Sequence, residues 1–264
     1  MIKDGITGID AIYHGIDKIQ KSFSGYDMVF DEFADYKIVG KFDNTNVQSP
    51  TVYYNTNNPL TVTTSGDYFF IETIPSNATS IKFDKDSKIT SVLKFDFAST
   101  SMSTAFENCA DLIYVDFSQS DFSNCTHMGW MFKNTGFSTL TLNFNTSSVS
   151  NMQSCFNYMS NLTEIDLSRI DTSAVTTMRT MFQNDSNLET INLSNFDMSA
   201  VTDYGYMFQN CSKLTTLVLN DVDNDTFAKL TNYGTSYLAK TVTIMRDGDV
   251  YQYDQTQDKW IINT

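Results

Sequence analysis

Several features that catalytic and metal sites need are scarce in this sequence. Only two of its 264 residues are histidines. His14 lies in an expected turn, and His127 lies beside a methionine expected in the core. No G-x-S-x-G, H-E-x-x-H or phosphate-binding glycine loop occurs. We therefore expect a non-enzymatic protein with no catalytic residues and no cofactor.

One acidic stretch begins like a calcium loop, at Asp221-Val-Asp223-Asn-Asp225. Such a loop needs glycine at its sixth position, for a sharp turn, and a bidentate glutamate at its twelfth. Thr226 and Asn232 occupy those two positions. We expect no metal site here.

Basic residues and long apolar runs are also scarce. The chain has 17 lysines and arginines against 31 aspartates and glutamates, a formal net charge of −14. This charge argues against nucleic acid or an anionic membrane as a partner. It either keeps a thin molecule soluble or serves recognition of a cationic partner, and we favour solubility. No apolar run reaches membrane-spanning length, and the first ten residues lack the apolar region of a signal peptide. We expect no membrane insertion.

A repeated phrase organises the middle of the chain. Five times, an apolar residue is followed three and four residues later by two more, and the last is always phenylalanine: Phe106, Phe132, Phe156, Phe182 and Phe208. These phenylalanines fall 26, 24, 26 and 26 residues apart, and a fixed period of this length indicates a solenoid. The i, i+3, i+4 spacing within the phrase predicts one face of a short helical turn.

Each phrase is followed by a strand and a return segment. The strands have the spacing L-x-x-L-x-L, as in Leu162/Ile165/Leu167, so that inward and outward residues alternate. In the return, an Asp or Asn is followed two residues later by Ser, which predicts a side-chain-capped turn. The two columns of this turn are Asp121/Asn145/Asp171/Asp197 and Ser123/Ser147/Ser173/Ser199.

The predicted fold class is mainly β with short helical turns, a leucine-rich-repeat-like solenoid with β-rich N-terminal and C-terminal caps. Caps are expected because the open ends of a solenoid need cover. The predicted units are a short β attachment segment (1–33), a β-rich N-terminal cap (34–98), a solenoid of about five repeats (99–220) and a C-terminal cap with a β-meander (221–264).

The four cysteines indicate no disulfide framework. Cys109 and Cys211 hold the same position in the first and last repeats. At a strand spacing of ~4.8 Å, four coils place them roughly 20 Å apart, beyond disulfide reach. Cys125 and Cys155 fall in apolar columns. We expect all four to be buried as small hydrophobic residues.

The repeat resembles the BspA-type leucine-rich repeat proteins of bacterial surfaces, whose repeats read roughly L-x-x-L-D-L-S-x-F-D-T-S-x-V-x-x-M-x-x-M-F. Residues Leu162 to Phe182 match at nearly every defined position, and the next copy departs chiefly at Met198 and Tyr204. The resemblance implies extracellular recognition or adhesion without a shared ligand, and it implies no catalytic residues. Typical secreted members carry export and anchoring signals, and we expect neither here.

Residues 1–33 contain a second, shorter pattern. Tyr13-His-Gly15 is echoed at Phe23-Ser-Gly25 between alternating apolar positions, which predicts short β-strands joined by glycine turns. The segment resembles short N-terminal segments of phage virion proteins, and this implies attachment to other virion proteins. A plain β-cap is the alternative. Because such short strands are weak alone, we expect homo-oligomerisation through them.

The outward residues of the stacked strands are expected to form one exposed ribbon. Their hydroxyl, amide and acid side chains suit hydrogen bonding to a glycan or a polar protein surface, although merely solvated strand residues have the same pattern. The candidate ligand-binding residues are Tyr114, Asp116, Thr139, Thr141, Glu164, Asp166, Thr190, Asn192 and Thr216. The C-terminal cap offers an alternative binding or oligomer surface, at Tyr251, Tyr253 and Trp260.

These patterns lead to one functional hypothesis and one alternative. The hypothesis is a non-enzymatic structural or binding protein, a phage virion fibre or decoration protein on the outer virion surface, whose solenoid contacts a host-cell surface glycan or protein. The alternative is a BspA-like adhesin at the bacterial cell surface, or an intracellular protein-interaction scaffold in the cytoplasm.

Overall fold

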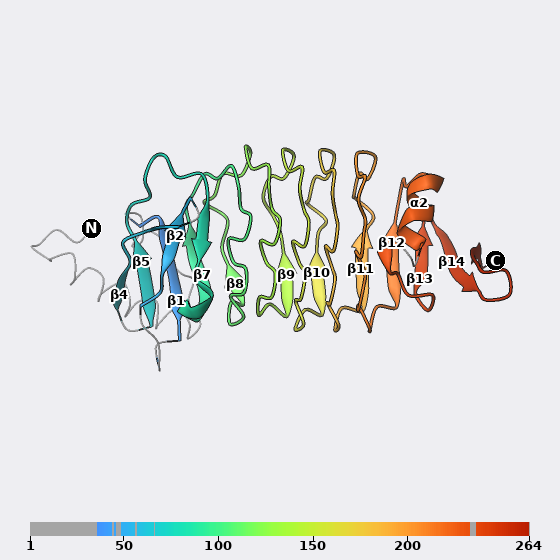
Figure 1. Cartoon of the computed structure of the whole chain (residues 1–264), viewed down its shortest axis with the longest axis horizontal. Coiled ribbons are helices and arrows are strands. Elements are labelled where there is room, and N and C mark those ends of the chain that lie inside the picture. The colour runs from blue at the N-terminus through green and yellow to red at the C-terminus, as the bar shows by residue number, and fades with distance from the viewer. Residues whose placement is uncertain are drawn as a thin grey trace, which may run out of the picture.

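The chain forms a row of coils stacked along one axis, with a sheet-rich cap at one end and a helix and hairpin at the other (Figure 1). It is mainly β and solenoidal, as the sequence predicts. The predicted β attachment segment, 1–33, lies outside the described residues. The structure is a computed structural model, and it describes residues 36–263 except 44, 46–48, 56, 66 and 233–235.

The regular elements are short. The N-terminal part contains β1 (Ile38–Phe42), β2 (Val52–Tyr54), β3 (Asn58–Pro59), β4 (Thr63–Ser65), β5 (Tyr68–Ile71), β6 (Ile81–Phe83), the 3-10 helix η2 (Lys85–Ser87) and β7 (Ile89–Phe95). The coils contain β8 (Tyr114–Val115), β9 (Thr139–Thr141), β10 (Glu164–Asp166), β11 (Thr190–Leu193) and β12 (Thr216–Leu219). The C-terminal part contains α2 (Asn224–Thr231), β13 (Thr243–Arg246), β14 (Asp249–Asp254) and β15 (Lys259–Ile262).

The outermost strands of the stack continue into both caps. β7 pairs parallel with β8 on one side and antiparallel with β1 on the other, giving a sheet in the order β4-β5-β1-β7-β8. At the far end, β13 pairs parallel with β12 and then antiparallel with β14, which pairs with β15. The first and last coils are thereby paired at their edges rather than left open.

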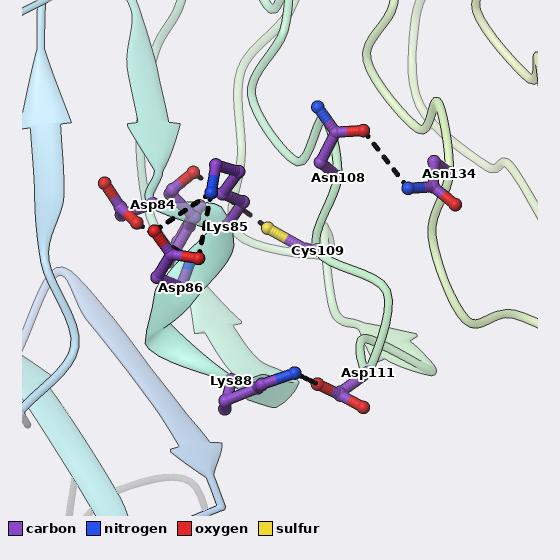
Figure 2. A network of polar contacts seen from close by, with 9 residues as sticks. Asp84, Lys85, Asp86, Lys88, Asn108, Cys109, Asp111 and Asn134 are labelled. Atoms are coloured by element: carbon purple, nitrogen blue, oxygen red, sulfur yellow. Dashed lines mark hydrogen bonds and ion pairs between the residues drawn. The ribbon is translucent and has the colours of Figure 1, made fainter. Parts of the chain in front are cut away.

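A second contact fixes the N-terminal cap to the first coil through η2. Asp84 caps this helix, and Lys88, which follows it, forms an ion pair with Asp111 of the first coil at 3.2 Å (Figure 2). The backbone N–H of Phe83 donates to the carbonyl of Ala105 at 2.8 Å. The cap and the first coil are therefore joined by backbone and side-chain bonds as well as by β7.

The Met/Phe phrase does not form the short helical turn that its spacing predicts. It forms successive turns with i to i+3 hydrogen bonds, such as Ala105 N to Met102 O and Cys109 N to Phe106 O, both 3.1 Å. Each coil has two residues of positive φ, one inside the phrase and one two residues after its phenylalanine: Thr104/Asn108, Trp130/Asn134, Ser154/Tyr158, Thr180/Asn184 and Tyr206/Asn210. The second residue is asparagine in four of the five coils, and asparagine tolerates this left-handed conformation.

These turns direct alternate backbone N–H groups at the neighbouring coil. Phe106 N donates to the carbonyl of Met131 at 3.0 Å, and Phe132 N donates to that of Cys155 at 2.9 Å. In an α-helix the same N–H groups would bond to carbonyls four residues earlier. The sequence does not reveal the difference, because both geometries keep the apolar residues of the phrase on one face.

A ladder of stacked phenylalanine rings runs through the core. The ring centroids of Phe106, Phe132, Phe156, Phe182 and Phe208 follow one another at 5.8, 6.1, 5.6 and 6.3 Å, with interplanar angles of 20° or less. Phe83 from β6 extends the ladder by one ring, 5.0 Å from Phe106. All five repeat rings are buried, so the ladder contributes large apolar area in every coil.

The predicted capped turns are present in the returns. The side-chain oxygen of each Asp or Asn in the first column accepts the backbone N–H of the serine two residues later, at 2.9–3.0 Å. Bonds from these serines lower the pKa of the aspartates among them, Asp121, Asp171 and Asp197. The four cysteines are free and buried, as predicted, and burial raises the pKa of the Cys109 thiol to about 12.

We predict that Phe156→Ala destabilises the chain by about 3–5 kcal/mol in urea unfolding, because it removes a ring stacked on both sides and leaves a cavity. Ile113→Ala is the control, because Ile113 is 62% exposed, and it should change stability by less than about 0.5 kcal/mol. Equal effects of the two substitutions would contradict the ladder's role.

Candidate binding ribbon

The outward residues of the coil strands form an exposed, polar ribbon. In β10, exposed Glu164 and Asp166 flank buried Ile165. In β9, two exposed threonines flank buried Leu140 in the same way. The parallel register places Glu164 beside Thr139 and Asp166 beside Thr141. The alternation follows from the strand period of two, with the apolar residues facing the core.

The remaining predicted ligand-binding residues lie at outward positions of the other strands. Thr190 and Asn192 are exposed in β11, and Thr190 lies beside half-buried Thr216 of β12. Tyr114 in β8 is 47% exposed, and Asp116 follows β8 and is half-buried. All nine therefore belong to one ribbon. Its first coil presents the ring of Tyr114, and its later coils present hydroxyl, amide and carboxylate groups.

The ribbon is not one continuous sheet. β9 pairs with β10 and β11 pairs with β12, but no backbone ladder joins β8 to β9, and none joins β10 to β11. Asn195 bridges the coils of β10 and β11 instead, since its Nδ2 donates to the carbonyls of Leu167 and Ile170 at 2.9 and 3.1 Å. The side of the stack formed by the Met/Phe turns, which we call the turn face, has no such interruption. Parallel bridges run along it through Ser101, His127, Asn151, Thr177 and Asp203.

A groove of about 380 Å³ lies over the gap between β10 and β11. It brings together four of the nine predicted residues: Glu164, Asp166, Thr190 and Asn192. The other five lie on the ribbon but outside the groove. Its remaining lining residues are Thr163, Ile165, Leu167, Ser168, Ser194 and Asn195.

The groove presents polar groups that are partly fixed in place. Asp166 Oδ1 accepts the backbone N–H of Ser168 at 2.9 Å, and Asn192 Oδ1 accepts that of Ser194 at 3.0 Å. Hydrogen bonds from Ser168 lower the pKa of Asp166, so this carboxylate is ionised at neutral pH. The lining contains no histidine, cysteine, lysine or arginine. Such a site suits hydrogen bonding of a polar ligand.

Asn195 is a lining residue outside the nine predicted ones, and it is the one whose side chain joins the two coils. The equivalent position in the preceding repeat is Arg169, so no column of like residues marks it. Its asparagine amide fits between two coils whose strands are not paired, and only the structure shows that these strands part. No signal in the sequence identifies this position.

The calcium-like stretch has a structural role in the chain. Asp223 caps α2, because its side chain accepts the backbone N–H of Thr226 at 2.8 Å. Among the residues that the structure describes, no three His, Cys, Asp or Glu side chains gather in a way that would hold a metal ion. Within the same residues, none of the helices has both the length and the apolarity to cross a bilayer.

Stacked coils, capped turns and an outward polar ribbon define a solenoid repeat protein. Residues 100–224 match a family described as "Mycoplasma protein of unknown function, DUF285". The match covers the coils and the ribbon groove and leaves most of both caps outside. No curated protein matches the chain, and no solved structure matches it.

One buried carboxyl lies in the core beneath the turn face. Asp185 is fully buried, and its Oδ1 accepts the backbone N–H of Met159 at 2.8 Å. Its Oδ2 has no hydrogen-bond partner. Burial therefore raises the pKa of Asp185 well above its ordinary value, since a buried, half-satisfied carboxylate is costly when charged.

We predict that Asp185→Asn raises the melting temperature at about pH 8 and that this gain shrinks as the pH falls toward 4. The native pKa of Asp185 is raised, so its contribution to stability is full below the unfolded pKa and is lost as pH rises through the native pKa. Above the native pKa, the lost stability amounts to about 1.4 kcal/mol for each unit by which the native pKa exceeds the unfolded pKa. Asparagine cannot ionise and avoids this loss.

The control for this prediction is Asp249→Asn, which removes the same charge at an exposed position of β14. Differential scanning calorimetry across the pH range measures both variants. A pH-independent effect of Asp185→Asn, or an equal effect of Asp249→Asn, would show that Asp185 is not a buried acid of raised pKa.

Proposed function

We propose that the chain is a non-enzymatic recognition protein displayed on the outer surface of a cell or particle. In this proposal the groove between β10 and β11 binds a polar partner on another surface, either a glycan or a polar protein segment. The single observation that supports it best is the groove itself. It lies between the unpaired strands β10 and β11 and gathers exposed Glu164, Asp166, Thr190 and Asn192.

The chemistry of the lining supports a polar, uncharged or cationic partner. Hydroxyl and amide groups exchange hydrogen bonds with sugar hydroxyls or peptide groups, and each net bond contributes about 1 kcal/mol. The two carboxylates disfavour an anionic partner, as does the net charge of −14. Oligomerisation through the N-terminal segment would place several weak grooves side by side and raise the avidity.

Two kinds of protein with this recognition function, a bacterial cell-surface protein and a phage virion protein, have separate support. The match of residues 100–224 to a Mycoplasma family, together with the BspA-type repeat, favours a bacterial cell-surface protein. The Tyr13-His-Gly15 pattern supports a phage fibre or decoration protein attached to other virion proteins through 1–33. Mass spectrometry of particles purified from a lysate of the source culture distinguishes them. Co-purification with capsid or tail proteins supports the virion, and recovery from the cell envelope alone supports the bacterial surface.

We predict that Thr190→Trp, which fills the groove, weakens binding of the fluorescently labelled chain to whole bacterial cells by about tenfold or more, equivalent to about 1.4 kcal/mol. Thr139→Trp is the matched control. It makes the same change in an exposed threonine of the ribbon, outside the groove lining. Flow cytometry measures binding of both variants and of the unaltered chain.

Unchanged binding by Thr190→Trp would contradict the groove as the contact site. Equal loss by both variants would instead assign binding to the whole ribbon, and circular dichroism would establish that each variant is folded. Cells bound equally well by a denatured sample would contradict the recognition function itself.

A further inference from the structure

The hairpin of β14 and β15 ends the molecule on the side opposite the N-terminal cap (Figure 1). β15 is the last strand of the sheet β11-β12-β13-β14-β15, and no other strand in the described part of the chain pairs with its outer edge. An open edge of this kind presents unpaired backbone N–H and C=O groups, and it can pair with a strand of another chain.

The register of the hairpin shows which backbone groups of β15 point outward. Asn263 N donates to the carbonyl of Val250 at 2.8 Å, and in an antiparallel ladder such hydrogen-bonded pairs alternate with non-hydrogen-bonded ones. Ile261 therefore bonds to β14. The N–H and C=O groups of Trp260 and Ile262 point away from β14, so these two residues supply the donors and acceptors of the open edge.

This edge lacks the features that usually prevent pairing between molecules, which are very short strands, charges and prolines. The edge strand at the opposite end, β4, has only three residues, and all of them carry hydroxyl groups. β15 reads Lys-Trp-Ile-Ile, with one charge at its start, and Ile262 is 46% exposed. The edge therefore has apolar area that a second strand would bury.

We infer that two copies of the chain pair through β15, antiparallel and about a two-fold axis at Ile261. In this arrangement Trp260 of one copy lies opposite Ile262 of the other, and their outward backbone groups exchange two hydrogen bonds. A two-fold contact needs a surface that is complementary to itself, and here each apolar residue of β15 meets another apolar residue. Lys259 lies opposite Asn263, so no like charges face each other.

The neighbouring registers that use the same backbone groups are less favourable. A two-fold axis at Trp260 places exposed Ile262 opposite the charged Asp258 of the second copy. An axis at Ile262 places Trp260 opposite the polar Thr264. Only the axis at Ile261 matches apolar residues along the whole pair, which favours a second copy in this one register.

The acidic charge of the chain opposes the pairing only weakly. In the joined sheet the two stacks of coils extend away from each other, and charges separated by more than about 8 Å are largely screened at physiological salt. Because two short strands bury less area than a standard interface, we expect a weak dimer that forms as the chain concentration rises. Added salt should strengthen the dimer, since it screens the repulsion between two chains of net charge −14.

The pairing makes both ribbon grooves face the same way. The axis runs perpendicular to the joined sheet, so the outward faces of both copies lie on one side of it. Cross-strand neighbours share a face, and the register connects outward Asn192 of the groove to Ile261 in this way. Two grooves would then contact one surface together, which raises avidity. This consequence rests on the proposed function, whereas the pairing of β15 does not.

Sedimentation equilibrium of the full chain tests the pairing. Ile261→Lys and Ile261→Asp each place two like charges face to face on the axis, and each should weaken self-association about tenfold or more. An equimolar mixture of the two variants should restore it, because opposite charges then meet. Met245→Lys is the matched control, at an exposed position of the same sheet face two strands from the edge, and it should leave self-association nearly unchanged.

Two outcomes of this experiment would overturn the inference. Self-association that is equal in all samples, or absent from the unaltered chain, would show that β15 does not pair with a second copy. A mixture that associates no better than either variant alone would show that the losses do not come from a two-fold contact. Any association through residues 1–33 is common to all samples and cancels in the comparison.

Ile261→Cys gives a second measurement, which captures weak pairing. On the axis the two copies of this residue form a non-hydrogen-bonded pair with Cα atoms about 4.5 Å apart, within reach of a disulfide. Mild oxidation should therefore yield a covalent dimer on a non-reducing gel. Met245→Cys should yield far less, although Met245 is 44% exposed and Ile261 is half-buried. Equal cross-linking of both variants would show random collision, and together with no cross-linking of Ile261→Cys it would overturn the inference.

Discussion

Hydrogen bonding from coil to coil, through turns with left-handed residues, is the constraint on which the rest of the structure depends. Each Met/Phe phrase donates alternate N–H groups to the next coil, and this holds the phenylalanine rings in one ladder. The rings lie 5.6–6.3 Å apart, wider than the ~4.8 Å of a strand ladder. The interval beside the unpaired strands β10 and β11, from Phe156 to Phe182, is the shortest of the four at 5.6 Å, so the spacing of the rings does not cause the interrupted pairing.

The last return of the stack departs from the repeat at Met198 and Tyr204, and both departures follow from the way the coils stack. Within the stack, the Thr146 and Thr172 hydroxyls donate to carbonyls of the next return, at 2.9 Å. At the last return no further coil offers such a carbonyl, and buried Met198 stands in place of threonine. Tyr204, which replaces the column's methionine, donates its hydroxyl to the Met198 carbonyl at 3.2 Å. The two departures from the repeat therefore form one local adaptation to the cap.

Much of the fold could be predicted because its signals repeat. The period, the inward leucines and the Asp-x-Ser turns each appear in several coils, and each column reinforces the others. The turn conformation could not be predicted, because helix and left-handed turns bury the same positions of the phrase. The nine outward residues were visible in the sequence, but which four line a groove depends on the gap between β10 and β11, which no column of like residues marks. The role of Asn195 depends on contacts between segments with no shared pattern.

The most direct test of this account is the detection of scalar couplings across the coil-to-coil hydrogen bonds by NMR spectroscopy of the deuterated, isotope-labelled chain. The account predicts a coupling between the amide nitrogen of Phe132 and the carbonyl carbon of Cys155, whose N···O distance is 2.9 Å, and an equivalent coupling from Phe106 to Met131. A coupling from Phe132 to the carbonyl of Met128, four residues earlier, would show a helix in place of the turns and would contradict the account.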